Sequence, residues 1–285
     1  MFIREPFRNS AAEHDIGCSS KFVEREVEPV PLERFCEFVS PSPAELDAFA
    51  DATTCRREFK RRQAITRQGD PVGEVYLLRN GWVTSSIEVD FSRCQLVKIH
   101  LPGDIAGLPS IALAQAAETL VAVSPATVDV IPLERLGRLF ERAPRLAFTL
   151  FVRSQQERVL LIDHLAAVAQ TTAVQRVCAF LLHVYRRLKL FGQCTDQLIR
   201  WPLSQEHMAQ GAGLTSIHVN RTLRELRRKG IIAREGRSIR LLDLDRLSEL
   251  AALPERAFVR EPPWLTSVAE TSPAGEANPR RQKPD

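Results

Sequence analysis

Residues 213–230, GLTSIHVNRTLRELRRKG, form a short predicted helix that carries two different kinds of face. Val219, Leu223 and Leu226 recur at helical spacing and make the apolar stripe that packs on a core. A second stripe holds side chains that can contact bases or phosphates: Ile217, Asn220, Arg221, Arg224 and Arg228. Three arginines on a face that the core does not use favour an anionic partner.

The second stripe has a defined chemistry on double-stranded DNA. In a helix–turn–helix, the N-terminal residues of the second helix meet base edges in the major groove. There Arg221 can pair with guanine, Asn220 can pair with adenine, and Ile217 can pack on a thymine methyl group. These three are the predicted base-reading residues.

The predicted contacts to the DNA backbone surround the base-reading residues. Thr215, Ser216 and the amides at the helix start can hold a phosphate, and each neutralised phosphate adds salt dependence to binding. The full predicted set is Ser204, Thr215, Ser216, His218, Arg224, Arg228 and Arg237. Two alternatives stay open: Arg224 and Arg228 can simply solubilise the helix, and His218 can be an ordinary surface residue.

The elements around this helix predict a winged helix–turn–helix. Ser204 and Thr215 are suited to cap two successive helices, and Gly213 lies in the turn between them. Gly230 ends the second helix, and IIAREGRSIRLL predicts a β-hairpin that turns near Gly236. Several independent signals therefore agree in their order along the chain.

Strand signals dominate between residues 55 and 132. VYLLRNGWVTSSIEV predicts a β-hairpin around Asn80-Gly81, CQLVKIHLPGD predicts a further strand, and TLVAVSPATVDVIPL predicts two more. Such even spacing is typical of an antiparallel barrel or jelly roll. The predicted fold class is therefore α+β, with an N-terminal antiparallel β jelly roll, a long dimerisation helix and a C-terminal winged helix–turn–helix.

Helices flank the strands. PSPAELDAFA predicts a short helix, and PLERLGRLFERAP predicts another that ends before Pro144. Pro144 then suits the first turn of a long helix with one partly polar seam, as in a dimerisation helix. The seam comprises Leu146, Leu150, Arg153, Glu157, Leu160, His164 and Ala167. The alternative is a helix that packs on the barrel of its own chain.

The chain has 285 residues, which is enough for two compact domains. The predicted parts are a flexible extension (1–30), a sensor jelly roll (31–132), connecting and dimerisation helices (133–168), a winged helix–turn–helix DNA-binding domain (169–252) and a disordered tail (262–285).

Composition is that of an ordinary soluble protein, with 44% hydrophobic and 26% charged residues. No apolar run approaches the roughly 20 residues that span a bilayer. The N-terminus, MFIREPFRNSAAEHD, lacks the apolar core of a signal peptide. We therefore expect a cytoplasmic protein with no membrane partner. The net charge is only +4, but residues 201–242 carry eight Lys and Arg against three Asp and Glu.

The order of these elements resembles the Crp/Fnr family of bacterial transcription regulators over residues 35–250. The resemblance is carried by ITRQGDP, YLLRNGWV and HLPGDIAGL in the jelly roll and by LSQEHMAQGAGLTSIHVNRTLRELRRKGII in the winged helix. It implies a cyclic-nucleotide-binding-like jelly roll and a homodimer on a two-fold symmetric DNA site, with half-sites about one helical turn apart. It also implies RNA polymerase as a partner if the protein is an activator.

In the recognition helix, some residues match the family pattern and one departs from it. Arg221 matches the family's recognition arginine, and Asn220 matches a position that reads a base in some members. Ile217 departs from the pattern, because the family usually has a glutamate there that contacts cytosine. We therefore expect a half-site that differs from the best-known ones.

The signal that the jelly roll senses is not identified by the sequence. Gly103 and Asp104 stand near the Gly-Glu pair of cyclic-nucleotide-binding members and are the candidate effector-pocket residues. No arginine lies between Arg93 and Arg135, so the cation that would grip a cyclic phosphate is missing, which argues against cyclic AMP. The six cysteines are widely spaced, which argues against an iron–sulfur cluster.

Two other kinds of signal are conceivable. His100 or His164 could bind haem, and Cys178 or Cys194 could respond to oxidation. In each case the alternative is a residue with a purely structural role.

We expect no enzymatic activity. The alternative is a cupin-like metal enzyme, which needs several histidines inside the barrel, but only His100 lies within residues 55–132. A regulator controlled by a docking protein partner, rather than by a small ligand, is the second alternative.

Overall fold

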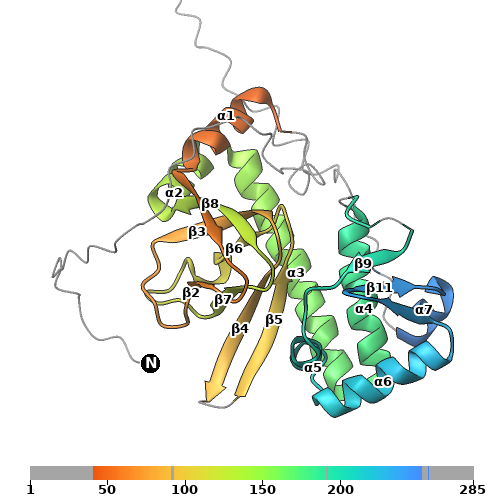
Figure 1. Ribbon diagram of the computed structural model, residues 1–285. Helices are drawn as coiled ribbons and strands as arrows, with labels where there is room; N and C mark the ends of the chain where they lie inside the picture. Colours follow the sequence, from red (N-terminus) through yellow and green to blue (C-terminus); the bar gives the residue numbers. More distant parts are fainter. Residues whose placement is uncertain (1–40, 91–92, 191, 195, 252–255, 257–285) are drawn as a thin grey trace, which may run out of the picture.

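The computed structural model describes residues 41–90, 93–190, 192–194, 196–251 and 256. A β-rich sensor lobe and a helical lobe lie side by side, and the long helix α3 (Pro144–Gln170) runs between them (Figure 1). The predicted extension and tail, 1–30 and 262–285, lie outside the described residues. None of the described helices is both long and apolar enough to cross a membrane.

The sensor lobe is a jelly roll of two antiparallel four-stranded sheets, which confirms the predicted fold class. One sheet has the order β1-β8-β3-β6 and the other has the order β2-β7-β4-β5. The strands are β1 Cys55–Phe59, β2 Ala64–Thr66, β3 Glu74–Asn80, β4 Val83–Asp90, β5 Arg93–His100, β6 Ile105–Ala106, β7 Thr119–Ala122 and β8 Ala126–Pro132. Apolar side chains from both sheets fill the space between them, including Leu78, Val83, Leu120 and Val128.

The segment around Asn80-Gly81 does not form the predicted hairpin. β3 pairs with β6 and β8, whereas β4 pairs with β5 and β7, so the two strands belong to different sheets. Gly81 has a left-handed φ of 87°, and a Cβ there would lie 2.2 Å from the carbonyl oxygen of Pro125. The Asn-Gly pair therefore marks a corner between sheets, where only glycine permits the close approach of the backbone.

Helices cover one end of the sensor lobe. α1 (Pro43–Ala52) begins with a reciprocal capping box between Ser42 and Glu45. α2 (Leu133–Arg142) stops before Pro144, which occupies the first turn of α3 as predicted. The apolar residues of these helices pack with those of β3 and β8 in one cluster, which includes Phe49, Leu77, Ile131, Leu139 and Leu146.

The first half of the α3 seam predicted for dimerisation packs inside its own chain. Leu146 and Leu150 are buried in the sensor-lobe cluster, and Arg153 and Glu157 form ion pairs with sensor residues. The outward side of α3 carries a different apolar set, which is Phe151, Leu161, Ile162, Leu165 and Val168. Periodicity could not separate the two sides, because α3 is apolar on both.

The helical lobe is a winged helix–turn–helix. Its helices are α4 (Ala173–Leu190), α5 (Gln205–Ala212), α6 (Ser216–Arg228) and α7 (Leu244–Ala251). Its small sheet has the order β10-β11-β9, with strands β9 Leu198–Arg200, β10 Ile232–Glu235 and β11 Ser238–Leu241. β10 and β11 are the predicted hairpin. β9 was not predicted, because a strand of three residues is too short for a periodic signal.

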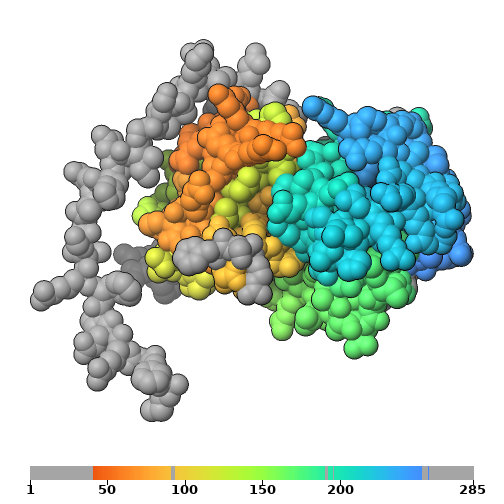
Figure 2. Space-filling model, turned by 60° about the horizontal axis from the view of Figure 1, so that its bottom comes forward, coloured from red at the N-terminus to blue at the C-terminus, as the bar shows by residue number. Residues whose placement is uncertain are grey.

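One hydrophobic cluster runs through both lobes. Trp82, Leu96 and Ile99 of the sensor lobe belong to the same cluster as Met208 of α5. The rings of Trp82 and Trp201 meet edge to face, with centroids 6.3 Å apart. Figure 2 shows the orange and yellow surface of the sensor lobe directly against the teal and cyan surface of the helical lobe. Apolar packing therefore fixes the orientation of the two lobes in this conformation.

Candidate nucleic-acid interface

α6 is held in place by the apolar stripe predicted from the sequence. Val219, Leu223 and Leu226 are buried in the cluster shared by both lobes. Thr215 caps the start of the helix by accepting a hydrogen bond from the His218 amide at 3.4 Å. The core and the cap together leave the other face of the helix turned to solvent.

The outward face of α6 carries the three predicted base readers. Ile217 is 79% exposed, the highest value among the exposed large apolar side chains of the described chain. Arg221 is exposed, and Asn220 is half-buried beside the core stripe. Ile217 adds nothing to the core, so stability does not explain its residue type.

Four exposed arginines on α6 and the wing have no partner within the part of the chain that the structure describes. They are Arg221, Arg224, Arg228 and Arg237, and none of their side chains makes a hydrogen bond or an ion pair there. Unpaired guanidinium groups on one surface attract an external anion, and guanidinium is well matched to phosphate.

Neighbouring cations of the same lobe behave differently. Lys229 pairs with Glu225 at 2.7 Å, and Arg240 pairs with Glu235 at 2.5 Å. The lack of partners is therefore not a general property of the basic residues in this lobe.

The remaining predicted backbone contacts lie at helix starts. Ser204 Oγ accepts a hydrogen bond from the His207 amide, and the Ser204 amide donates one to His207 Nδ1, each at 3.1 Å. Thr215 Oγ1 also lies 3.0 Å from His218 Nδ1, and Ser216 is exposed in the first turn of α6. These side chains shape two helix N-termini, whose free amides can bind phosphate.

A second group of charges lies between the lobes, and sequence reasoning missed its role. The side chain of Asp104 is 1% exposed, and it pairs with Arg187 of α4 and, at 3.7 Å, with Arg153 of α3. Arg187 also donates a hydrogen bond to the Ile99 carbonyl at 2.5 Å. Burial lowers the pKa of Arg187 to about 10, so the guanidinium group stays charged at neutral pH.

A further ion pair joins the sensor lobe to α3. Lys98 of β5 pairs with Glu157 of α3. Burial acts to raise the pKa of Glu157, but the charge and hydrogen bond of Lys98 outweigh it, so the pKa is lowered. We call Lys98, Asp104, Arg153, Glu157 and Arg187 the junction. Its members lie far apart in the sequence, so no local motif could have identified it.

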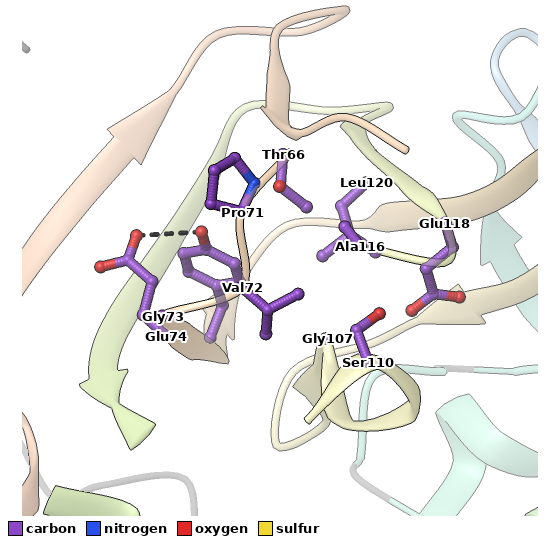
Figure 3. A pocket seen from close by; sticks show the side chains of 11 residues that line it. Thr66, Pro71, Val72, Gly73, Glu74, Gly107, Ser110, Ala116, Glu118 and Leu120 are labelled. Carbon is purple, nitrogen blue, oxygen red and sulfur yellow. Dashed lines mark hydrogen bonds between the residues drawn. The ribbon is translucent and has the colours of Figure 1, made fainter. Parts of the chain in front are cut away.

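A small cavity lies inside the sensor lobe, beside β3, β7 and the short helix η2 (Leu108–Ser110) (Figure 3). Its volume is about 20 Å³, which holds about one water-sized group. Glu74 lines it and accepts a hydrogen bond from the Tyr76 hydroxyl at 2.9 Å. Glu118 also lines it and is 4% exposed, and burial raises the pKa of Glu118.

The lining of this cavity does not match an anionic ligand. None of the described residues that line it carries a positive charge. Gly103 and Asp104, the predicted effector-pocket residues, are not among them, because Asp104 belongs to the junction. A phosphate placed here would meet the carboxyl groups of Glu74 and Glu118 rather than a cation.

The two cysteines considered for redox control, Cys178 and Cys194, have poorly reactive thiols. Burial raises the pKa of Cys178 to about 12, and it also raises the pKa of Cys194. A high pKa keeps a thiol protonated and therefore poorly nucleophilic at neutral pH. Cys18 and Cys36 lie outside the described residues.

The two candidate haem ligands lie on different elements. His100 is buried at the end of β5, and His164 lies on α3 with a pKa that burial lowers. Among the described residues, no group of three or more His, Cys, Asp or Glu side chains could hold a metal ion.

A jelly roll packed on a winged helix–turn–helix, with unpaired arginines on the recognition helix, defines a DNA-binding regulator with a sensor domain. Residues 56–143 match the cyclic nucleotide-binding domain, and residues 175–250 match the Crp-like helix-turn-helix domain. The chain belongs to the Crp/Fnr family of bacterial transcription regulators.

Individual relatives agree with this family. The transcriptional activator protein anr of Pseudomonas aeruginosa is 27% identical over 226 residues, which cover 77% of this chain and 90% of that protein. The transcriptional regulatory protein btr of Bordetella pertussis is 28% identical over 221 residues, with the same coverage. The solved structure of FixK2 from Bradyrhizobium japonicum superposes with a TM-score of 0.65 at 27% identity, and covers 71% of this chain and 99% of FixK2.

Proposed function

We propose that this chain regulates transcription by binding a two-fold symmetric DNA site as a homodimer. The observation that carries the proposal is the outward face of α6, where the base readers are accessible and the arginines have no partner in the described chain. Ile217, Asn220 and Arg221 contact base edges in the major groove. Arg224, Arg228, Arg237 and the helix starts at Ser204 and Thr215 hold the backbone.

The outward apolar side of α3 is the proposed contact with a second copy of the chain. Regulators of this type act as dimers, and Leu165 on this side is 71% exposed. Leu165→Glu should convert the dimer to a monomer in light-scattering measurements, because a charge would be buried at the contact. Leu113→Glu, at an exposed apolar position of the sensor lobe, is the control. If the Leu165→Glu variant remained a dimer, the outward side of α3 would not be the dimer contact.

The sensor cavity supports a regulator that does not answer to cyclic AMP, because the charged side chains that line it are the carboxyl groups of Glu74 and Glu118. No catalytic role is part of the proposal. The relative anr is named a transcriptional activator. If this chain also activates transcription, RNA polymerase is its further partner.

Selection of bound DNA from a random duplex pool tests the proposed function. Repeating the selection with and without air also reveals any redox control. The expected product is a pair of inverted half-sites about one helical turn apart. Failure of the purified protein to enrich any sequence would refute sequence-specific binding.

A further inference from the structure

Glu118 is a buried carboxyl group with an unpaired oxygen atom. It directly precedes β7 and is 4% exposed, and its Oε1 atom makes no hydrogen bond among the described residues. A carboxylate that is removed from water without a partner is costly, so such a group either keeps a proton or binds a cation. The space and the charges around Glu118 decide between the two.

The space beside Glu118 is the sensor cavity, which has room for about one water-sized group. Figure 3 shows Glu118 and Ser110 on one side of this cavity and Glu74 on the other. The polar side chains that line it all carry oxygen and none carries nitrogen: Thr66, Glu74, Tyr76, Ser110 and Glu118. Hydroxyl and carboxylate oxygens accept hydrogen bonds and coordinate hard cations. The lining therefore suits a small positively charged group.

The two carboxyl groups of the cavity are compensated differently. Arg57 donates a hydrogen bond to each carboxylate oxygen of Glu74, at 2.5 Å and 3.2 Å. Lys98, the cation that acts electrostatically on Glu118, is hydrogen-bonded instead to Glu157 of α3. In the part of the chain that the structure describes, Glu118 thus has no directly bonded cation, whereas Glu74 has one.

A single monovalent cation matches this site in charge and in size. Calcium and magnesium take six or more oxygen ligands, and no group of three or more His, Cys, Asp or Glu side chains among the described residues could hold a metal ion. An organic ligand such as a nucleotide needs a far larger pocket than about 20 Å³. Ammonium and the alkali-metal ions remain.

Lys98 connects this site to α3. Burial raises the pKa of Glu118, the Ser85 hydroxyl and the charge of Lys98 act to lower it, and the charge of Glu157 acts to raise it. A bound cation responds to neighbouring charges as a proton does, so Lys98 opposes it and Glu157 favours it. Such coupling is reciprocal, so a cation on Glu118 also strengthens the Lys98–Glu157 pair.

We infer that the sensor cavity binds one small monovalent cation, ammonium or an alkali-metal ion, on the carboxylate of Glu118, and that this cation strengthens the attachment of the sensor lobe to α3. The inference deepens the proposed function, on which its regulatory meaning rests, by naming the class of signal at the sensor lobe. The binding itself is measured without DNA.

Urea unfolding of the full chain at neutral pH, in chloride salts of constant ionic strength, tests the inference. Ammonium, potassium or sodium replaces tetramethylammonium stepwise, because tetramethylammonium has the same charge and is too large for the cavity. A ligand of the folded state divides the unfolding constant by 1 + [L]/Kd. Glu118→Gln removes the charge and keeps the shape of the side chain. Glu141→Gln, at an exposed carboxyl group on α2, is the matched control.

At least one small cation should lower the unfolding constant of the wild-type protein along a one-site curve, by roughly tenfold at ten times the fitted Kd. Glu141→Gln should respond as the wild type does, and Glu118→Gln should not respond. In tetramethylammonium chloride alone, Glu118→Gln should be at least as stable as the wild type, which verifies that this variant folds.

The coupling to α3 is tested by the same titration on two further variants. Lys98→Met removes the opposing charge and should bind the cation several-fold more tightly. Glu157→Gln removes the favourable charge and leaves Lys98 free to approach Glu118, so it should bind the cation several-fold more weakly. Each variant is compared with its own stability in tetramethylammonium chloride, so its intrinsic loss of stability does not enter.

Three results would overturn the inference. If no small cation stabilised the wild-type protein, Glu118 would be protonated and the cavity would need no ion. If Glu118→Gln responded as the wild type does, the ions would bind elsewhere. An unchanged cation affinity in Lys98→Met and Glu157→Gln would remove the coupling to α3. A selection that enriches no DNA sequence would refute the proposed function instead and would leave the cation titration unchanged, so the two failures are distinguishable.

Discussion

Arginine has opposite surroundings in two regions of this protein. On the outward face of α6, Arg221 and Arg224 are exposed and have no partner in the described chain. At the junction, the side chains of Arg153 and Arg187 are each 11% exposed, and both lie against Asp104. A guanidinium group is well solvated in water, whereas an unpaired charge removed from water costs several kcal/mol.

This difference indicates that the arginines of the α6 face bind a ligand, whereas the arginines of the junction stabilise the fold. The junction supplies its own negative charges, so its arginines bind the sensor lobe to α3 and α4. The outward arginines of the α6 face have no hydrogen-bonded or ion-paired carboxylate in the described chain, which favours an anionic partner from outside. Pairing within the chain, rather than the number of arginines, distinguishes the two roles.

Breaking the junction should produce the largest effect. Arg187→Met removes the closer of the two arginines that pair with buried Asp104 and leaves the longer contact to Arg153, so the free energy of unfolding should fall by about 3 kcal/mol. Urea denaturation measures it. Arg246→Met, which removes an exposed pair with Glu249 on α7, is the control and should cost less than about 1 kcal/mol. If both variants lost the same free energy of unfolding, the buried arginines of the junction would not differ from exposed paired arginines in their effect on stability.

Removing an arginine from the α6 face should affect DNA and leave the fold intact. Arg221→Ala should weaken specific DNA binding by about 1–3 kcal/mol per half-site. Its free energy of unfolding should change by less than about 0.5 kcal/mol, as for other surface substitutions. Titration of the selected duplex measures the first quantity and urea denaturation the second. A variant that unfolds more easily yet binds DNA normally would reverse the roles of the two regions.

The α6 region could be predicted from the sequence because its determinants are local. The Thr215 cap, the stripe from Val219 to Leu226 and Gly230 all lie within one short stretch, and the structure confirms each as an element of the fold. Their roles on DNA stay predictions. The exposure of Ile217 followed from the same periodicity.

The junction could not be predicted, because its residues meet only when the jelly roll, α3 and α4 are assembled. The same limit explains the error at Asn80-Gly81, where a hairpin and a corner between sheets have the same local sequence. It also explains why the first half of the α3 seam lies inside the chain, since burial against the sensor lobe decides which apolar side of α3 remains outside.

Ile217 offers a finer test of the α6 face. Ile217→Glu should move the base preference at one position of each half-site, because a carboxylate accepts a hydrogen bond from cytosine and cannot pack on a thymine methyl group. The change should be about 1 kcal/mol or more in relative affinity, read from a repeated selection. Val89→Glu, another exposed apolar residue but on β4, should leave the preference unchanged. An unmoved preference in Ile217→Glu would mean that α6 is wrongly placed in the groove.

The smallest effect concerns two carboxyl groups near Lys98. Burial acts to raise the pKa of both, but the ion pair with Lys98 gives Glu157 a lowered pKa, whereas Glu118 keeps a raised one. Ionised Glu157 therefore stabilises the fold above its ordinary pKa of about 4.3, and this contribution disappears as pH falls through its folded-state pKa. Glu118 has the opposite sign, because the folded state favours its protonated form and its charge costs stability at neutral pH.

Glu157→Gln should lower the free energy of unfolding at pH 7 by about 0.2–1 kcal/mol, a small value because the Glu157 side chain is 34% exposed. Glu118→Gln should raise it at the same pH. Both differences from the wild type should shrink as pH falls, since protonation then removes the charges that the substitutions remove. Urea denaturation across this pH range measures both variants. If Glu157→Gln instead stabilises the protein at pH 7, the Lys98 pair is not a net stabilising contact, and pairing at the junction cannot be explained by the cost of buried charge.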